Sequence, residues 1–210
     1  MTRPLIISDC DEVLLHMVAP FKKWLEASQG VDFNLEGHNF AEALRWKATG
    51  EVLQAMDTWK MLGRFFDTEM DTQEPIEGAV EAINALSELA DIVVLTNLVD
   101  ERREKRAEQL AKVGILAPVY TNQGPKGPAL KAILDEYGAD RRAVFIDDLA
   151  QHHVSVKETV PNVVRLHMCG EPMIAEGITC AHKEGNADAR IDRWADALPW
   201  LVARLEKEPA

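Results

Sequence analysis

The sequence predicts an α/β protein with a doubly wound, Rossmann-like parallel sheet, interrupted after its first strand by a mostly α-helical insertion. Three observations support this fold class. Short apolar runs alternate with longer segments of helical period, which is the pattern of βα units. Polar residues follow each apolar run at one end. Roughly sixty residues without a convincing strand separate the first run from the second, far more than an ordinary connection.

The apolar runs are too short to be helices, and they therefore predict buried strands of a parallel sheet. A run at residues 118–121 is weak, and the four clear runs are residues 5–8, 92–95, 143–146 and 163–166. Apolar residues at three- and four-residue spacing predict helices at residues 78–89, 101–112, 128–137 and 191–205. With 210 residues, the chain is long enough to bury the core of such a sheet.

The segment between the first two strands is expected to form a separate helical domain. Its periods predict helices at residues 17–28, 40–47 and 51–67, whereas "VDFNLEGHN" looks like a loop and "DTQEPIEG" like a return linker. The expected domains are an α/β core of residues 1–15 and 78–210 and a helical cap of residues 16–77. Five aromatic residues of the cap are expected to pack its interior: Trp24, Trp46, Trp59, Phe65 and Phe66.

Composition narrows the classes of function. A formal net charge of −12 argues against a nucleic-acid partner, because phosphate backbones are bound by clustered Lys and Arg. No apolar run approaches the ~18 residues that span a bilayer, so no membrane segment is expected. The first residues do not have the pattern of a signal peptide, and three irregularly spaced cysteines do not suggest a disulfide framework. We therefore expect a cytoplasmic protein.

Polar residues that can do chemistry gather at the carboxyl end of the expected strands. In chain order they are Asp9 and Asp11, then Thr96 and Asn97, then Lys126, and finally Asp147 and Asp148. Because parallel α/β sheets bind ligands at this edge, we expect one site here. Strand alternation would place Asp9 and Asp11 on one face, with Cys10 turned away. Clustered carboxylates favour Mg²⁺ over zinc, and Lys126 with the Thr96 hydroxyl could bind phosphate oxygens.

This set of motifs resembles the haloacid dehalogenase (HAD) superfamily. Asp-x-Asp-x-Val follows the first strand, a Thr follows the second, and a Lys precedes a final Asp-Asp, all in the family order between residues 5 and 148. The insertion resembles that family's helical cap of the first type. The resemblance implies a Mg²⁺-dependent phosphatase that acts on a small phosphorylated metabolite through an aspartyl-phosphate.

The same resemblance implies a role for each residue of the site. Asp9 would be the nucleophile, and Asp11 the general acid and then the general base. Thr96 and Lys126 would hold the phosphoryl group, with backbone groups of Asp11 and Asn97 assisting. The implied metal ligands are Asp9, Asp11, Asp147 and Asp148, of which Asp148 would bind Mg²⁺ directly and Asp147 directly or through water.

The sequence departs from the family pattern at three places. Glu12 stands where many members have Gly. Lys126 is followed by Gly-Pro, and Lys131 is the less suitable substitute because it lies one turn inside the expected helix. No further acid follows Asp148 within the next few residues, so metal ligation would depend on fewer carboxylates.

Two other functions fit the same fold. A 2-haloacid dehalogenase attacks carbon and needs no metal, so it would not use Asp11 as a proton donor. A non-catalytic phosphate-binding protein could retain the fold alone. A receiver domain also uses Asp, Thr and Lys, but its acidic pair comes first along the chain, whereas here the pair Asp147 and Asp148 comes last.

The cap is expected to act as a lid, because it leaves the core just after Asp11 and returns before the strand that ends at Thr96. A lid would favour a small phosphorylated metabolite over a phosphoprotein. Four basic residues of the cap could face an anionic substrate: Arg45, Lys47, Lys60 and Arg64.

Overall fold

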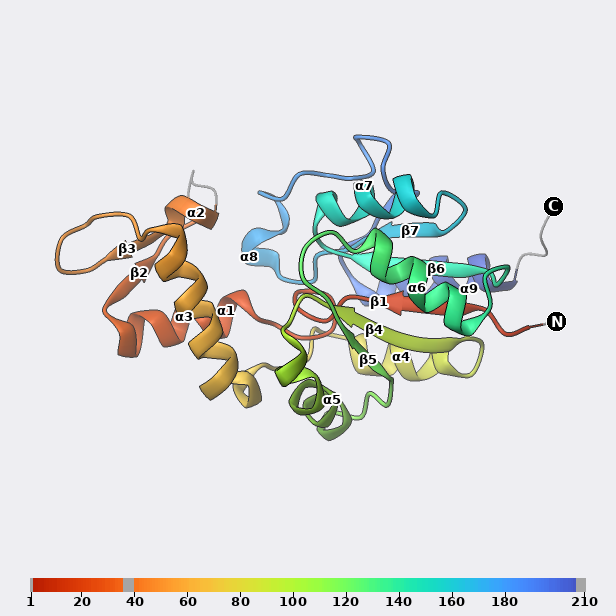
Figure 1. The fold of residues 1–210 in the computed structure, drawn as a ribbon, viewed down its shortest axis with the longest axis horizontal. Helices are drawn as coiled ribbons and strands as arrows, with labels where there is room; N and C mark the ends of the chain where they lie inside the picture. The colour runs from red at the N-terminus through yellow and green to blue at the C-terminus, as the bar shows by residue number, and fades with distance from the viewer. Residues whose placement is uncertain (1, 36–39, 207–210) are drawn as a thin grey trace. The chain divides into compact units, whose positions relative to one another are not determined.

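A sheet of six parallel strands forms the centre of the α/β part of the chain (Figure 1). This computed structural model describes residues 2–35 and 40–206, and the strand count refers to those residues. The strand order is β5-β4-β1-β6-β7-β8, so β1 is central and the chain fills one side of it before the other. The bounds are β1 Leu5–Ser8, β4 Asp91–Thr96, β5 Val119–Thr121, β6 Ala143–Asp147, β7 Val164–His167 and β8 Ala189–Arg190. The strand order reverses beside β1, where doubly wound sheets bind ligands.

Alternate residues of the central strands pack on opposite faces of the sheet. Leu5 and Ile7 belong to one apolar cluster, and Ile6 belongs to the other. The first cluster includes side chains of α6 (Gly127–Tyr137) and α7 (Ala150–Thr159). The second includes side chains of α4 (Ala79–Ser87), α5 (Arg103–Lys112) and α9 (Trp194–Glu206). Since helices cover both faces, the strands are continuous apolar runs without polar alternation.

The fold class predicted from the sequence is therefore confirmed, and the predicted core elements shift by only a few residues. Short elements escaped the sequence analysis: the 3₁₀ turn η3 (Asp100–Arg102), the helix α8 (Pro172–Ala175) and the two-residue strand β8. None of these is long enough to show a periodic pattern. Among the described helices, none combines the length and the apolar character needed to cross a bilayer.

The insertion contains strands that the sequence analysis did not expect. The chain divides into an α/β unit of residues 2–15 and 75–206 and an insertion of residues 16–74. In the insertion, β2 (Val31–Phe33) and β3 (Leu44–Trp46) pair antiparallel. The expected loop at 31–39 is thus a strand at its start, while residues 36–39 lie outside the described part. The expected helix at 40–47 ends with α2 at Phe40–Ala43. Three-residue runs are too short to reveal a period of two, and pairing across the chain decided them.

The helices of the insertion pack around an aromatic cluster. They are α1 (Val18–Trp24), continued by the π-helical turn η1 (Leu25–Gln29), then α3 (Ala55–Thr68) and the 3₁₀ turn η2 (Met70–Thr72). The Phe21 ring lies 5.3 Å from Phe65 and 6.1 Å from Trp24, between ring centroids. The expectation of core packing holds for Trp24, Phe65 and Phe66. It is wrong for Trp59, which is 70% exposed because α3 turns it away from the buried Phe65.

The chain returns to the α/β unit slightly earlier than the sequence suggested. Pro75 bridges to Leu15, and the Ile76 N–H donates to the Leu14 carbonyl at 2.9 Å. Residues 75–77, expected in the cap, therefore belong to the α/β unit. The points where the chain leaves and rejoins this unit lie side by side, a few residues after Asp11.

Gly127 sets the close approach of α6 to α7. Its N–H donates to the Ser155 hydroxyl at 3.0 Å. A Cβ built at Gly127 would lie under 3.0 Å from the Ser155 carbonyl oxygen, a distance that real Cβ atoms essentially never show. The glycine that follows Lys126 in the sequence is therefore a packing requirement, since any side chain would push the two helices apart.

We expect Gly127→Ala to destabilise the protein by about 2 kcal/mol or more, because the added methyl group meets backbone that cannot move aside. Gly177→Ala is the matched control: its Cβ would lie 3.6 Å from the Ile174 carbonyl oxygen, an ordinary contact, and should change stability by about 0.5 kcal/mol or less. Urea denaturation monitored by circular dichroism measures both. Equal stability of the two variants would contradict the packing argument.

Candidate active site

Three carboxylates lie together where β1 and β6 end. Asp9 follows β1, Asp147 is the last residue of β6, and Asp148 comes next; one carboxylate oxygen from each lies within 4.8 Å of the other two. All three residues are buried, with exposed fractions of 7%, 0% and 6%. The Asp9 N–H donates to the Ile146 carbonyl at 2.8 Å, which joins the two strand ends. The structure thus brings together three of the residues that the sequence analysis placed at this sheet edge.

Lys126 is the cation of this cluster. Its Nζ lies 2.6 Å from Asp9 Oδ1 and 2.7 Å from Asp147 Oδ2. Burial alone would lower the pKa of Lys126, but the two carboxylates outweigh it and raise the pKa above its usual range. Lys131, the substitute considered above, is instead exposed and lies 2.7 Å from Asp135. Lys126 therefore stays charged, and unlike Lys131 it contacts the acidic cluster.

One lysine does not neutralise three carboxylates. When all three are ionised, two negative charges are in excess. Burial raises the pKa of Asp9 to about 7, with Asp147 and Asp11 adding repulsion and Lys126 opposing it. Burial and the repulsion of Asp147 and Asp9 likewise raise the pKa of Asp148. For Asp147 burial is outweighed, chiefly by Lys126, and the pKa is lowered.

This imbalance fits a hard divalent cation. Oxygen ligands from several carboxylates are the set that Mg²⁺ prefers, and a charge of +2 would cancel the excess. Metal binding would also favour the ionised form of Asp9 and Asp148, whose pKa values are raised. The residues present therefore fit the metal that the family resemblance implies, with Asp9, Asp147 and Asp148 as its carboxylate ligands.

Thr96 and Asn97 follow β4 beside the cluster. The Thr96 hydroxyl is buried and has no hydrogen-bond partner among the described residues. A buried donor without a partner is costly, so this atom is expected to meet a ligand or water. Asn97 uses its side chain locally: Nδ2 donates to the Gly124 carbonyl at 3.0 Å, and Oδ1 accepts from Asn122 Nδ2 at 2.9 Å. The Asn97 side chain thus contacts the neighbouring loop at Asn122 and Gly124.

The Asp11 side chain points toward α5 and lies outside the acidic cluster. Both of its oxygens accept hydrogen bonds from Arg106 Nη2, at 3.0 Å and 3.2 Å. Arg106 Nη1 also donates to Cys10 Sγ at 3.1 Å. The expectation that Asp9 and Asp11 share a face while Cys10 turns away is therefore wrong. Its physical reason is that β1 ends at Ser8, so strand alternation does not continue to residue 11.

The backbone conformation of Glu12 is the one that the glycine of the family pattern would favour. Its backbone has φ of 63°, in the left-handed region that favours glycine. Hydrogen bonds on both sides hold this conformation: its N–H donates to the Leu15 carbonyl at 2.8 Å, and its carbonyl accepts from the Gly170 N–H at 2.6 Å. The buried side chain adds a further negative charge that helps to raise the pKa of Asp148. The turn after Asp9 thus keeps a glycine-like backbone and gains an acid.

Two buried histidines hold the backbone of the Asp147–Asp148 pair. His153 Nε2 donates to the Asp147 carbonyl at 3.0 Å. His167 Nδ1 accepts from the Ala181 N–H at 2.9 Å, so its Nε2 carries the proton and donates to the Asp148 carbonyl at 2.7 Å. Burial lowers the pKa of both imidazoles, to about 4 for His153. Both rings are therefore neutral near pH 7 and act as fixed donors.

Two histidines lie in the first turn of α7. His153 holds the Asp147 carbonyl, while His152 Nε2 lies 3.4 Å from Asn97 Nδ2. The sequence analysis did not identify Arg106 or His167 as residues that support the site. A charged residue at a helix position that should be apolar was the available signal for Arg106.

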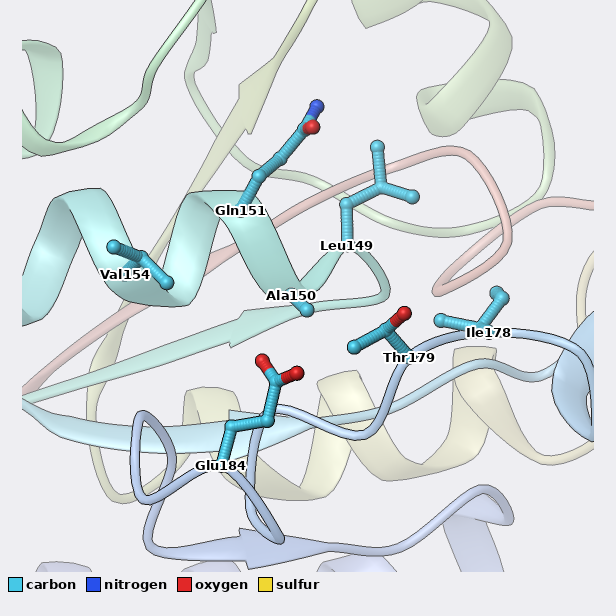
Figure 2. Close-up of a pocket in the computed structure, with 7 residues that line it drawn as sticks. All are labelled: Leu149, Ala150, Gln151, Val154, Ile178, Thr179 and Glu184. Atoms are coloured by element: carbon cyan, nitrogen blue, oxygen red, sulfur yellow. The ribbon is translucent and has the colours of Figure 1, made fainter. Parts of the chain in front are cut away.

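A cavity of about 430 Å³ begins one residue beyond the acidic cluster, at the N-terminus of α7 (Figure 2). It lies between the first turns of α7 and the segment after α8, and its lining is mixed apolar and polar: Leu149, Ala150, Gln151, Val154, Ile178, Thr179 and Glu184. No carboxylate of the cluster lines it. The cavity has room for a small organic group, but it is not the space around the carboxylates.

The buried His153 predicts a pH dependence of stability. Unfolded His153 has the ordinary pKa of about 6.5, while the folded pKa is about 4, so between these values the unfolded state binds more protons. Stability should therefore fall as the pH decreases from 6.5 to 4. The contribution of His153 should amount to about 2 kcal/mol across this window.

His153→Gln keeps a donor for the Asp147 carbonyl and cannot titrate. We expect the difference in unfolding free energy between wild type and His153→Gln to shrink by that amount between pH 7 and pH 4.5, since other titrating groups are common to both proteins. Urea denaturation at the two pH values measures it. A difference that does not change with pH would contradict a buried neutral His153.

The fold was compared with those of known proteins. No protein-family model and no curated protein matches the chain. A HAD family hydrolase from Deinococcus radiodurans R1, solved with bound phosphate and sodium, superposes with a TM-score of 0.65 at 17% identity, covering 99% of both chains. A Bacillus subtilis protein described as a HAD hydrolase and bound to magnesium gives 0.64 at 13%, covering 96% of this chain and 100% of the other.

A Lactobacillus plantarum protein described as a phosphoglycolate phosphatase gives a TM-score of 0.64 at 16% identity, covering 95% of this chain and 99% of the other. At sequence identities this low, the superpositions show a similar arrangement of helices and strands. The match extends over nearly the whole of each chain. The chain therefore has the haloacid dehalogenase-like fold.

Proposed function

We propose that this protein is a Mg²⁺-dependent phosphatase that hydrolyses a small phosphate monoester through an aspartyl-phosphate. The observation that carries the proposal is the charge imbalance of the site: three buried carboxylates face one lysine, and a buried threonine hydroxyl beside them has no partner in the described residues. A divalent cation and a phosphoryl group together would satisfy both features. Structural neighbours with bound phosphate or magnesium support this assignment.

In the first step, an Asp9 oxygen attacks phosphorus while the bond from phosphorus to the ester oxygen breaks. The electron pair leaves with the ester oxygen, which takes a proton from Asp11. In the second step, Asp11 takes a proton from water as the water oxygen attacks phosphorus and the bond from Asp9 to phosphorus breaks. Inorganic phosphate leaves, and both aspartates return to their starting forms.

The other residues hold the reacting groups in place. The Lys126 ammonium, already between Asp9 and Asp147, would bind a phosphoryl oxygen, and the Thr96 hydroxyl would donate to another. Asp9, Asp147 and Asp148 would hold the metal ion, which neutralises charge on the phosphoryl group when bound. His153 and His167 keep the Asp147–Asp148 backbone in register by donating to its carbonyl groups.

The alternative of the same fold is a 2-haloacid dehalogenase. That reaction needs one carboxylate nucleophile on carbon and has no use for two further buried carboxylates. A non-catalytic phosphate-binding protein would have no need of a nucleophile with a raised pKa beside a buried lysine. The phosphatase assignment accounts for every member of the cluster.

We expect wild-type protein to release phosphate from small phosphate monoesters only with Mg²⁺ present, and to lose the activity in excess EDTA. Asp9→Asn should reduce turnover at least about 10³-fold, because the amide is not a nucleophile. Its near-isosteric shape should leave the fold intact, since Lys126 keeps Asp147 as a partner. Phosphate release from a panel of metabolite esters and circular dichroism measure the two expectations.

Asp135→Asn is the control for Asp9→Asn, because Asp135 is an exposed aspartate of the same unit and lies beside Lys131. It should retain wild-type turnover. An Asp9→Asn variant with the wild-type rate would rule out the covalent mechanism. Chloride release from 2-haloacids that persists in EDTA, without phosphate release, would favour the dehalogenase.

We further propose that residues 16–74 act as a cap that limits substrate size. The two connections of this insertion are tethered side by side at Leu15 and Pro75, close in sequence to Asp11. Of the basic residues considered as substrate contacts, Lys47 lies 3.7 Å from Asp32 and Lys60 lies 3.5 Å from Asp57. Local carboxylates thus already accompany those two, and Arg64 is also exposed.

We expect kcat/KM for a small phosphate ester to exceed that for a folded phosphoprotein by about 10²-fold or more, because a cap excludes bulky substrates along with water. A short phosphopeptide from the same phosphoprotein separates size from sequence, and it should fall between the two. Preference for the folded phosphoprotein would contradict the cap role while leaving the phosphatase assignment intact.

A further inference from the structure

Arg106 is a charged side chain at a core position of α5. It shares the buried face of this otherwise strongly polar helix with Gln109 and Leu110. Burial alone would lower the pKa of Arg106, but the Asp11 carboxylate outweighs it and raises the pKa. The guanidinium is therefore buried as a cation. A buried cation costs several kcal/mol of desolvation, which is offset only where an anion and good hydrogen-bond geometry are present.

The contact with Asp11 has the geometry of an anchor. A single group, Arg106 Nη2, bridges both carboxylate oxygens at 3.0 Å and 3.2 Å. Nη1 donates to Cys10 Sγ at 3.1 Å, which fixes the guanidinium against the end of β1. The Arg106 side chain is 0% exposed and that of Asp11 is 16% exposed. Asp11 is thus held by a fully buried group, while a small part of its own side chain is exposed.

We propose that Arg106 is the positioning residue of Asp11, an inference that rests on the proposed phosphatase function. Asp11 lies past the end of β1, next to a residue with left-handed backbone, so the sheet does not fix its side chain. Instead, two hydrogen bonds from the fully buried Arg106 guanidinium fix the Asp11 side chain. Arg106 does not touch the substrate; it orients the carboxylate that exchanges a proton with the ester oxygen and then with water. Misplacement of such a group by about 1 Å costs up to 10²-fold in rate.

The role predicts a dependence on the leaving group. The 4-nitrophenolate ion departs readily without a proton, whereas an alkoxide requires the proton of Asp11. The parameter kcat/KM covers the steps up to cleavage of the ester bond, so it reports on this transfer alone. Loss of orientation should therefore lower kcat/KM for alkyl phosphates far more than for 4-nitrophenyl phosphate. A merely structural defect lowers both by the same factor.

The experiment compares kcat/KM for 4-nitrophenyl phosphate and propyl phosphate in wild type, Arg106→Met, Arg106→Lys and Asp11→Asn, and in Asp11→Asn combined with Arg106→Met. We expect Arg106→Met to lower the propyl phosphate value about 30- to 100-fold and the 4-nitrophenyl value less than about 5-fold. Arg106→Lys keeps a cation beside Asp11 and should recover part of the loss. In the Asp11→Asn background, Arg106→Met should add less than about 3-fold, because the group it orients is gone.

Arg103→Met is the matched control, since Arg103 is an exposed arginine of the same helix, and it should retain wild-type values. Equal losses on the two esters, or full multiplicative losses in the double variant, would overturn the positioning role and leave the phosphatase assignment standing. If Arg106→Met fails to fold, Arg106→Lys carries the same comparison of esters. A wild type that hydrolyses neither ester, while Asp9→Asn behaves identically, would refute the proposed function and this inference with it.

Discussion

Burial of like charges at one point of the sheet is the constraint on which the rest of this structure depends. Three carboxylates at the ends of β1 and β6 each place one oxygen within 4.8 Å of the others, with a single lysine between two of them. Such a cluster is unfavourable in a protein interior, because each carboxylate loses hydration and repels the others. The raised pKa values of Asp9 and Asp148 express that cost. A site strained in this way is suited to bind a cation and to react.

The surrounding elements are arranged to keep the cluster in place. Gly127 allows α6 to approach α7 closely, which brings Lys126, the residue before it, to Asp9 and Asp147. His153 and His167 donate to the backbone carbonyls of the Asp147–Asp148 pair from two different elements, α7 and β7. Burial keeps these rings neutral, so they add no charge to a balance that is already unfavourable. These contacts from the α/β unit hold the acidic cluster in a fixed geometry.

The two aspartates of the first motif contact different basic side chains. Asp9 contacts Lys126, which precedes α6, and Asp11 contacts Arg106 on α5, a helix that packs on the other face of the sheet. Each carboxylate therefore has its own buried partner and its own surroundings. Two chemically identical side chains can take different roles only when their environments differ in this way. In the proposed mechanism, the division between a nucleophile and a proton carrier would follow from which helix each aspartate faces.

Cap residues show how local pattern and long-range packing can disagree. The runs that form β2 and β3 are three residues each, and in isolation they do not show whether they are strand, loop or helix. Pairing between Val31–Phe33 and Leu44–Trp46 decided the outcome, since each strand provides the hydrogen-bond partners of the other. Trp59 is exposed although tryptophan is usually buried, because the face of α3 that it occupies is not the face that packs. Sequence alone does not choose the packed face when both carry apolar residues.

The sequence by itself determined the strand-helix alternation of the core, because fully buried strands must be apolar throughout and their helices must show a period of 3.6. It also determined which polar residues meet, since the carboxyl ends of parallel strands share one edge; Asp9, Lys126, Asp147 and Asp148 could be named before any coordinates. It did not determine that Asp11 turns to Arg106, because that contact joins residues 95 positions apart after β1 has ended. Nor did it identify His167, whose role depends on its two ring nitrogens meeting the Ala181 N–H and the Asp148 carbonyl. The spacing of apolar residues can be seen in the sequence itself. A buried ion pair between distant residues exists only once the fold has brought those residues together.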